Sequence, residues 1–103
     1  MKHFLIKYRF QDGSEEAWHK TIAEFISALD SDAALQGKIS YRCMKSRDGS
    51  DYYHLASVVD DEAVKALQAR AFFTSYTEKT KRAGGGTVDV VPLELIAETK
   101  RKA

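Results

Sequence analysis

The side chains of this chain that are best suited to chemistry are aromatic residues that carry a polar atom. Five of them are predicted to point into one interior layer between a sheet and its helices: Tyr8, Trp18, Tyr41, Tyr53 and Tyr76. A buried tyrosine hydroxyl or indole N–H needs a hydrogen-bond partner, which a side chain, water or a ligand can supply. The cluster is therefore the best candidate for a small-molecule pocket, with plain core packing as the alternative.

This cluster predicts two sets of site residues. The candidates for handling a proton are Tyr8, His54 and Tyr76, because tyrosine and histidine can act as general acids or bases. The predicted substrate-binding residues would face the same interior layer, and they are Tyr8, Trp18, Ile22, Tyr41, Leu67, Phe73 and Tyr76.

Other kinds of site lack the residues that they need. The histidines His3, His19 and His54 do not share an element at ligand spacing, and Cys43 has no second cysteine for a disulfide or a metal site. The glycine run 84–86 follows a predicted helix and precedes a strand, which is the reverse of a phosphate-binding loop. We therefore predict no metal, no haem and no other cofactor.

Composition and charge restrict the partners. The 103 residues include 16 basic and 15 acidic side chains, and a formal charge of +1 gives no attraction for nucleic acid or a membrane surface. Residues 51–55 lack the basic and aromatic run of RNA-recognition domains. Lys7 interrupts the apolar start after three residues, so it is no signal peptide, and no segment is long enough to span a membrane. We expect a soluble, cytoplasmic protein.

Two periodicities alternate along the chain. A period of two predicts strands at 2–10, 38–47, 52–59 and 87–95, and helical spacing predicts helices at 15–29 and 61–82. This β-α-β-β-α-β order is typical of a ferredoxin-like α+β fold with a four-stranded antiparallel sheet, here as a single domain over residues 1–103. Pro92 predicts that the last strand bends or lies at a sheet edge, and Leu95 and Ile96 beyond it are too apolar for a free tail.

The first strand indicates which face of the sheet the helices cover. One face carries Phe4, Ile6, Tyr8 and Phe10, and the other carries His3, Leu5, Lys7 and Arg9. Because burying Lys7 and Arg9 would cost several kcal/mol, the apolar face should pack on the helices, and His3 should face a partner subunit or solvent. The helix after this strand packs back on it, which should bring Trp18 next to Tyr8.

The two strands of the central hairpin are apolar on both faces. Helices on one side of the sheet can cover only one of these faces. The simplest cover for the other is an identical subunit, so we predict a homodimer with an isologous interface.

At this level the chain resembles the dimeric α+β-barrel superfamily, in particular the antibiotic-biosynthesis monooxygenase family and the stress-responsive α/β-barrel domains. The residues that carry the resemblance are Lys2-His3, Phe10-Gln11-Asp12-Gly13, Tyr52-Tyr53-His54 and the stretch from Glu62-Ala63-Val64 to Phe73. The resemblance implies two sheets packed face to face in a homodimer and a small-molecule pocket between each sheet and its own helices. The chain departs from the family in its second helix, where Leu67 and Arg70 to Phe73 stand in place of the family's histidines.

The resemblance implies a cofactor-independent enzyme of the monooxygenase-like or cyclase-like kind. Its substrate would be an aromatic or polyketide-like molecule, oriented by the aromatic side chains. The alternative is a non-catalytic, dimeric ligand-binding or structural protein of the same fold.

Overall fold

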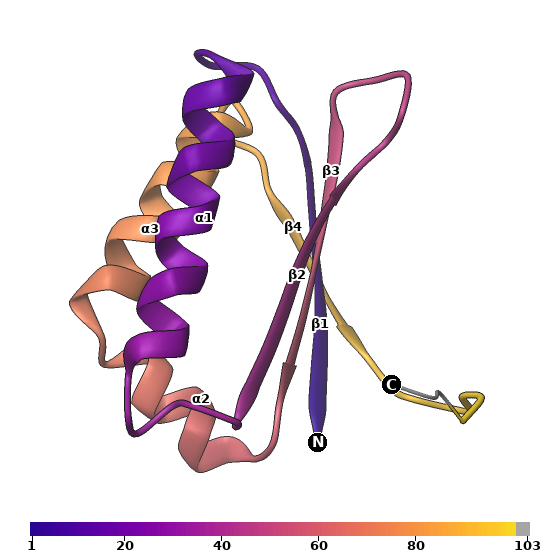
Figure 1. Ribbon diagram of the computed structural model, residues 1–103. Helices are drawn as coiled ribbons and strands as arrows, with labels where there is room; N and C mark the ends of the chain where they lie inside the picture. The colour runs from indigo at the N-terminus through magenta and orange to yellow at the C-terminus, as the bar shows by residue number, and fades with distance from the viewer. Residues whose placement is uncertain (101–103) are drawn as a thin grey trace.

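The computed structural model describes residues 1–100 and arranges them in two layers, a sheet and the helices that cover it (Figure 1). The elements are β1 (Lys2–Arg9), α1 (Glu15–Ser31), β2 (Ile39–Lys45), β3 (Asp51–Val58), α2 (Asp61–Gln68), α3 (Ala71–Ala83) and β4 (Asp89–Leu93). The strands form one antiparallel sheet in the order β2-β3-β1-β4. In the described part of the chain all helices lie on one face of this sheet. The predicted ferredoxin-like α+β fold is confirmed.

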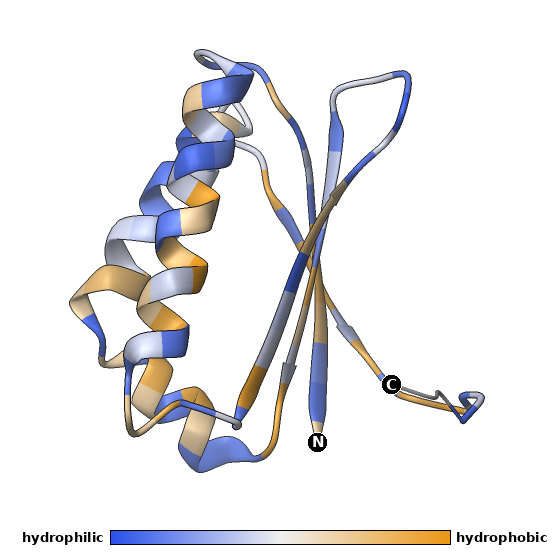
Figure 2. Cartoon of the chain, in the orientation of Figure 1, coloured by the Kyte–Doolittle hydropathy of each residue, from blue (hydrophilic) through white to orange (hydrophobic). Residues whose placement is uncertain are grey.

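Helix α1 begins where the sequence supplies a cap. Ser14 Oγ accepts a hydrogen bond from the Ala17 N–H at 3.2 Å, and Glu15 and Glu16 lie in the first turn, where negative charge favours the helix. Its apolar stripe is buried under the sheet and consists of Trp18, Ile22, Phe25 and Leu29. Figure 2 shows that hydrophobic residues gather on the side of the helices that faces the sheet.

The single helix predicted at 61–82 is wrong, because the structure has two helices, α2 and α3, with Ala69 and Arg70 between them. Arg70 has an extended backbone, with φ −82° and ψ 131°. Its guanidinium donates to both carboxylate oxygens of Asp32, just past the end of α1, at 2.6 and 3.3 Å. The apolar spacing continues across the break, so periodicity alone could not reveal it.

The register of the sheet decides which side chains face the helices. Paired residues in an antiparallel sheet share a face, and Ile6 pairs with the fully buried His54. His3 lies on the opposite face, where its Nδ1 is 2.7 Å from Ser57 Oγ. The prediction that Phe4 rather than His3 faces the helices is therefore confirmed.

The prediction that Tyr53 points into the interior layer is wrong. Successive strand residues point to opposite faces, and its neighbours Tyr52 and His54 are both buried under the helices. Tyr53 therefore lies on the outer face of the sheet, where 38% of its surface is exposed.

Strand β4 lies at an edge of the sheet, as Pro92 predicts. Among the described strands it pairs with β1 only, and Pro92 lies opposite Phe4 in that ladder. Beyond Leu93 the described chain has no regular structure and leads away from the sheet (Figure 1). Leu95 and Ile96, which the sequence predicts to be covered, are 53% and 85% exposed in the single chain.

We predict that the ion pair between Asp32 and Arg70 stabilises the break between α2 and α3. The hydrogen-bonded Arg70 lowers the pKa of Asp32, so the pair stabilises the fold above the ordinary carboxyl pKa of about 4, and this contribution is lost as the pH falls through the lowered value. Asp32→Asn should therefore lower the thermal midpoint at pH 7, and its difference from the wild type should shrink in acid.

Thermal unfolding followed by circular dichroism measures this effect. Asp30→Asn is the matched control, because Asp30 is an exposed residue of the same helix end. An equal loss of stability in both variants would contradict a specific role for the ion pair.

Candidate functional site

A cavity of about 720 Å³ lies between the sheet and the helices. Its apolar wall comes from both layers and includes Phe4, Ile6, Phe25, Leu29, Ile39, Ala56, Val58, Val64, Leu67, Phe73, Val88 and Val90. The polar side chains on the wall are Tyr41, Gln68, Tyr76, Thr77, Thr80, Lys81 and Thr87. A mostly apolar cavity of this size, with a few polar groups, suits a small aromatic molecule.

The predicted substrate-binding residues fall into two groups. Tyr41, Leu67, Phe73 and Tyr76 line the cavity, whereas Tyr8, Trp18 and Ile22 are buried in the interior and do not line it. Thr77, Thr80 and Lys81 of α3 also line the cavity and were not predicted from the sequence. The periodicity does not indicate them, because they belong to the polar part of a helix, and only the tertiary structure places this helix over the cavity.

A chain of hydrogen bonds connects the two groups. Trp18 Nε1 donates to the Tyr8 hydroxyl at 2.8 Å, and this hydroxyl lies 2.7 Å from His54 Nε2. On the other side of the ring, His54 Nδ1 lies 2.6 Å from the Tyr41 hydroxyl and 3.3 Å from the Tyr76 hydroxyl. The two tyrosine hydroxyls are 3.1 Å apart. The structure thus brings the three proton-handling candidates, Tyr8, His54 and Tyr76, into one network.

His54 is the centre of this network and is fully buried. Removal from water disfavours the charged imidazolium and lowers the pKa of His54 to about 4. Burial likewise raises the pKa of the Tyr8, Tyr41 and Tyr76 hydroxyls well above the ordinary value. At neutral pH the network therefore consists of uncharged groups that share hydrogen bonds.

Stacked rings hold the tyrosines of the network in place. Tyr76 stacks on Phe25 with ring centroids 3.8 Å apart and planes at 1°, and Trp18 lies parallel to Tyr76 with centroids at 6.0 Å. Tyr8 stacks on Tyr52 in the same way, with centroids at 5.4 Å and planes at 4°. Packed aromatic rings lose little further freedom when a ligand binds, so the polar atoms beside the cavity are already oriented.

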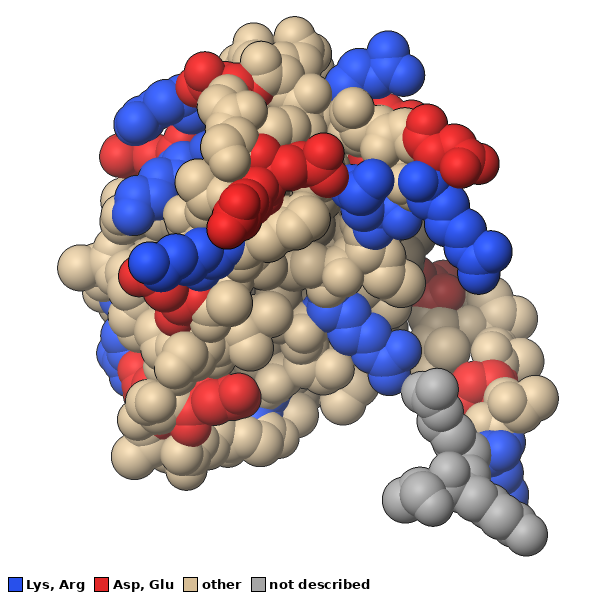
Figure 3. All heavy atoms as spheres, turned by 45° about the horizontal axis from the view of Figure 1, so that its top comes forward, with Lys and Arg blue, Asp and Glu red and all other residues tan. Residues whose placement is uncertain are grey.

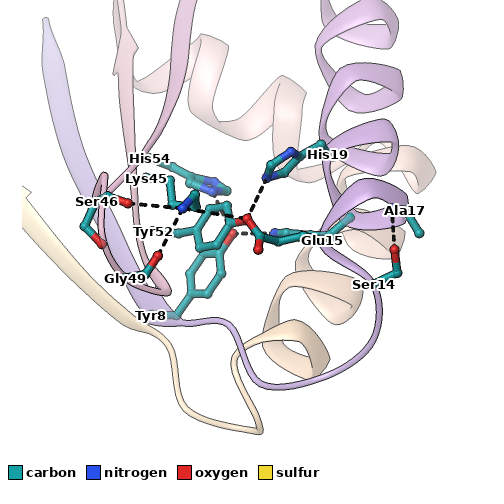
Figure 4. A network of polar contacts seen from close by, with 11 residues as sticks. Tyr8, Ser14, Glu15, Ala17, His19, Lys45, Ser46, Gly49, Tyr52 and His54 are labelled. Atoms are coloured by element: carbon teal, nitrogen blue, oxygen red, sulfur yellow. Dashed lines mark hydrogen bonds and ion pairs between the residues drawn. The ribbon is translucent and has the colours of Figure 1, made fainter.

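A second polar cluster lies at the solvent end of the same layer, beside Tyr8 (Figure 4). The Tyr52 hydroxyl is 2.7 Å from His19 Nε2 and donates to Glu15 Oε1 at 3.4 Å, and Glu15 is 3.7 Å from Lys45 Nζ. Burial, followed by the nearby charge of Glu15, raises the pKa of Tyr52 to about 12. This cluster was not predicted, because its only signal in the sequence is the four-residue spacing of Glu15 and His19 on α1.

Cys43 lies close to the tyrosine hydroxyls of the network. Burial raises the pKa of its thiol to about 11, although hydrogen bonds to Tyr76 and Tyr41 act in the opposite direction. A thiol with this pKa is protonated at neutral pH and is a poor nucleophile. Among residues 1–100, no three potential metal-ligating side chains of the His, Cys, Asp or Glu type come together.

The surface carries charges of both signs. On the face in Figure 3, basic and acidic side chains are interspersed over the helices and the loops. Within residues 1–100 no helix has both the length and the apolar character that crossing a bilayer requires.

We predict that the buried His54 makes the fold sensitive to acid. Its pKa is about 4 in the folded state and about 6.5 in an unfolded chain, so the unfolded state binds a proton first as the pH falls. The stability that this residue supports is complete above pH 6.5 and declines toward pH 4, by about 2–3 kcal/mol at pH 4.5. The free energy of urea unfolding at pH 7 and pH 4.5 measures the decline.

Two histidine variants separate this effect from the titration of carboxylates. His54→Gln should lose the decline, while His19→Gln, which changes an exposed histidine, should keep it. If His54→Gln keeps the pH dependence of the wild type, His54 is not the group responsible.

Comparison with known proteins identifies the fold. No protein-family model and no curated protein matches the chain. Among solved structures, SnoaB, a cofactor-independent oxygenase from Streptomyces nogalater, is 14% identical over 97% of both chains, with a TM-score of 0.76. Rv0793 from Mycobacterium tuberculosis is 13% identical over 96% of this chain and 98% of its own, with a TM-score of 0.75.

A third similar structure is a candidate antibiotic biosynthesis monooxygenase from Deinococcus radiodurans. It is 9% identical over the whole of both chains, with a TM-score of 0.74. Identities this low carry the fold and leave the activity to be argued from the site. The chain therefore has the α+β fold of the antibiotic-biosynthesis monooxygenase-like proteins, the group that its sequence resembles.

Proposed function

We propose that this protein is a cofactor-independent oxygenase-like or cyclase-like enzyme that acts on an aromatic or polyketide-like molecule. The observation that carries the proposal is the cavity of about 720 Å³, whose largely apolar wall includes Tyr41 and Tyr76. These two tyrosines are hydrogen-bonded to each other, and Tyr41 is hydrogen-bonded to the buried His54. The fold shared with SnoaB, a cofactor-independent oxygenase, supports the same kind of activity.

The proposed ligand follows from the wall of the cavity. Its apolar side chains favour fused rings, and the volume is within the range of sites for drug-sized molecules. Tyr41 and Tyr76 supply hydroxyls that can orient an oxygen substituent of those rings. The enzyme's part is to hold the molecule in one orientation.

An oxygenation without a cofactor requires the substrate to provide the electrons. A methylene group between aromatic rings can do this, because it reacts with O₂ to give a carbonyl group and water. One oxygen atom enters the substrate, and the other leaves as water with the two methylene hydrogens. Dioxygen accepts all four electrons from the substrate, and no other reductant is needed.

One observation favours a second candidate, a non-catalytic ligand-binding protein. Burial keeps the Tyr41 and Tyr76 hydroxyls protonated and His54 neutral, and His54 itself does not line the cavity. The cavity wall therefore offers no ready carboxylate or imidazole base to remove a proton from the ligand.

We predict that protein treated with a chelator takes up O₂ when it is given anthrone, a three-ring molecule with such a methylene group, and releases anthraquinone. Tyr41→Phe and Tyr76→Phe should each lower kcat/KM by about tenfold, because each removes a hydroxyl that orients the substrate. Oxygen-electrode and absorbance measurements follow the reaction. Tyr53→Phe on the outer face is the control and should retain the rate.

The measurements test both candidates. Anthrone binding without oxygen uptake above the uncatalysed rate would favour the ligand-binding protein. Absence of binding would contradict both candidates for this class of molecule.

We also propose that the outer face of the sheet packs against the same face of a second copy in a homodimer. Leu5 and Leu55 are paired on this face and only half-buried, and Val91 and Leu93 of β4 are 36% and 42% exposed. The Arg9 guanidinium on the same face is 3.4 Å from Asp51, so this positive charge is matched within the chain. Val91, Leu5 and Leu55 form an apolar row across three strands, with Arg42 at its end and Lys7 beside it, and exposed apolar residues grouped in this way can mark a buried interface.

We predict that the wild-type protein sediments as a dimer at micromolar concentration. Leu55→Lys should produce monomers, because it places two charges in the buried centre of an isologous interface. Ala23→Lys on the exposed side of α1 is the control and should leave the dimer intact. A monomeric wild-type protein would contradict the proposal.

A further inference from the structure

We infer that the Tyr41 and Tyr76 hydroxyls offer the cavity one unused hydrogen-bond donor, which selects a ligand with a carbonyl or enolate oxygen. Trp18 and Tyr8 act as positioning residues, because they determine which nitrogen of His54 carries the hydrogen. This tautomer in turn determines the direction in which the tyrosines donate. The ligand part of this inference rests on the proposed function, since it requires the cavity to bind a small molecule.

Trp18 and Tyr8 form the buried end of the network. An indole N–H can only donate a hydrogen bond, so Trp18 Nε1 occupies one acceptor direction of the Tyr8 oxygen, at 2.8 Å. The same oxygen is 2.7 Å from His54 Nε2. Tyr8 has a single hydroxyl hydrogen, and within residues 1–100 it has no further partner.

This arrangement determines the tautomer of His54. If Nε2 carried the hydrogen, it would donate to Tyr8, and the Tyr8 hydrogen would be left buried without an acceptor. If Nε2 is unprotonated, Tyr8 donates to it, and every donor at this end is satisfied. His54 is therefore the tautomer with hydrogen on Nδ1, because the neutral imidazole carries only one.

The tautomer of His54 also determines the direction of the hydrogen bonds on the cavity side of the ring. Nδ1–H donates to the Tyr41 hydroxyl at 2.6 Å, with the Tyr76 hydroxyl as a longer alternative at 3.3 Å. Burial lowers the pKa of His54 to about 4, which supports a neutral ring with one hydrogen at physiological pH. Both tyrosines line the cavity.

The number of donor hydrogens in the network exceeds the number of contacts by one, so one donor remains at the cavity wall. Trp18, Tyr8, His54, Tyr41 and Tyr76 each contribute one hydrogen, and the four contacts that link them in series use all but one. Because Trp18 donates to Tyr8 and Tyr8 donates to His54, the unused hydrogen belongs to Tyr41 or Tyr76. The Cys43 sulfur beside them is only a weak acceptor.

The unused donor specifies the chemistry of its partner. A carbonyl or enolate oxygen would accept this hydrogen, whereas an unsubstituted ring would leave it unpaired when the ligand displaces water. In the other tautomer Nδ1 would accept a hydrogen from one tyrosine, and the wall would have no donor to spare. Tyrosines alone do not decide the selectivity, because it depends on the fixed donor at Trp18.

The tautomer can be measured without a ligand. In the ¹⁵N-labelled protein, the nitrogen chemical shifts of His54 should show a protonated Nδ1 and an unprotonated Nε2. Trp18→Phe removes the fixed donor and should make the Nε2-protonated form detectable. Ile22→Val, which removes packing but no polar atom from the same buried stripe, should leave the shifts unchanged.

The ligand preference is tested with fluorene and fluorenone, which share three fused rings and differ in one carbonyl oxygen. Calorimetry should show fluorenone binding about five- to tenfold more tightly to the wild type. The double variant Tyr41→Phe/Tyr76→Phe should bind the two equally.

The outcomes separate this inference from the proposed function. A wild-type His54 protonated on Nε2 overturns the inference, and so does equal affinity for the two probes with the expected tautomer. Failure of both probes to bind contradicts the ligand part together with the proposed function, while the nitrogen shifts still decide the polarity of the network.

Discussion

The structure depends on how it satisfies one buried imidazole. His54 has no exposed surface, so both ring nitrogens must find partners inside the protein. Tyr8 and Tyr41 stand diagonally to it on the neighbouring strands, which brings their hydroxyls to the two nitrogens. Trp18 connects α1 to this network and Tyr76 connects α3, so five elements meet in one network of hydrogen bonds. A network that satisfies both nitrogens of a buried ring in this way favours one arrangement of sheet and helices.

The same network divides the interior into two parts. On one side Tyr8, Tyr52 and Trp18 fill the space between the layers with stacked and edge-on rings. On the other side the cavity remains between the layers, and the small side chains Ala56 and Thr80 are among those that line it. The cavity is therefore bounded by rigid aromatic groups at one end, and the atoms that could hold a ligand are oriented before it binds.

The region around the helix break shows how local and distant residues cooperate. Asp60 caps α2 by accepting a hydrogen bond from the Ala63 N–H at 2.8 Å, which is a purely local signal. The end of that helix depends instead on Arg70, whose guanidinium reaches Asp32 at the end of α1. The break lets α2 and α3 take different directions, and Leu67 and Phe73 from the two helices both reach the cavity wall.

The sequence alone determined the order of the elements, the inner face of β1 and the approach of Trp18 to Tyr8, because alternation, helical spacing and capping are local properties of the chain. It could not show that His54 joins these residues to Tyr41, since the histidine is separated from its partners by 46 and 13 positions. Tyr53 illustrates the same limit, because only the register of β3 shows that its neighbours face inward. The cavity, the helix break at Arg70 and the direction of the hydrogen bonds were decided by tertiary structure, because each depends on contacts between side chains that are distant in the chain.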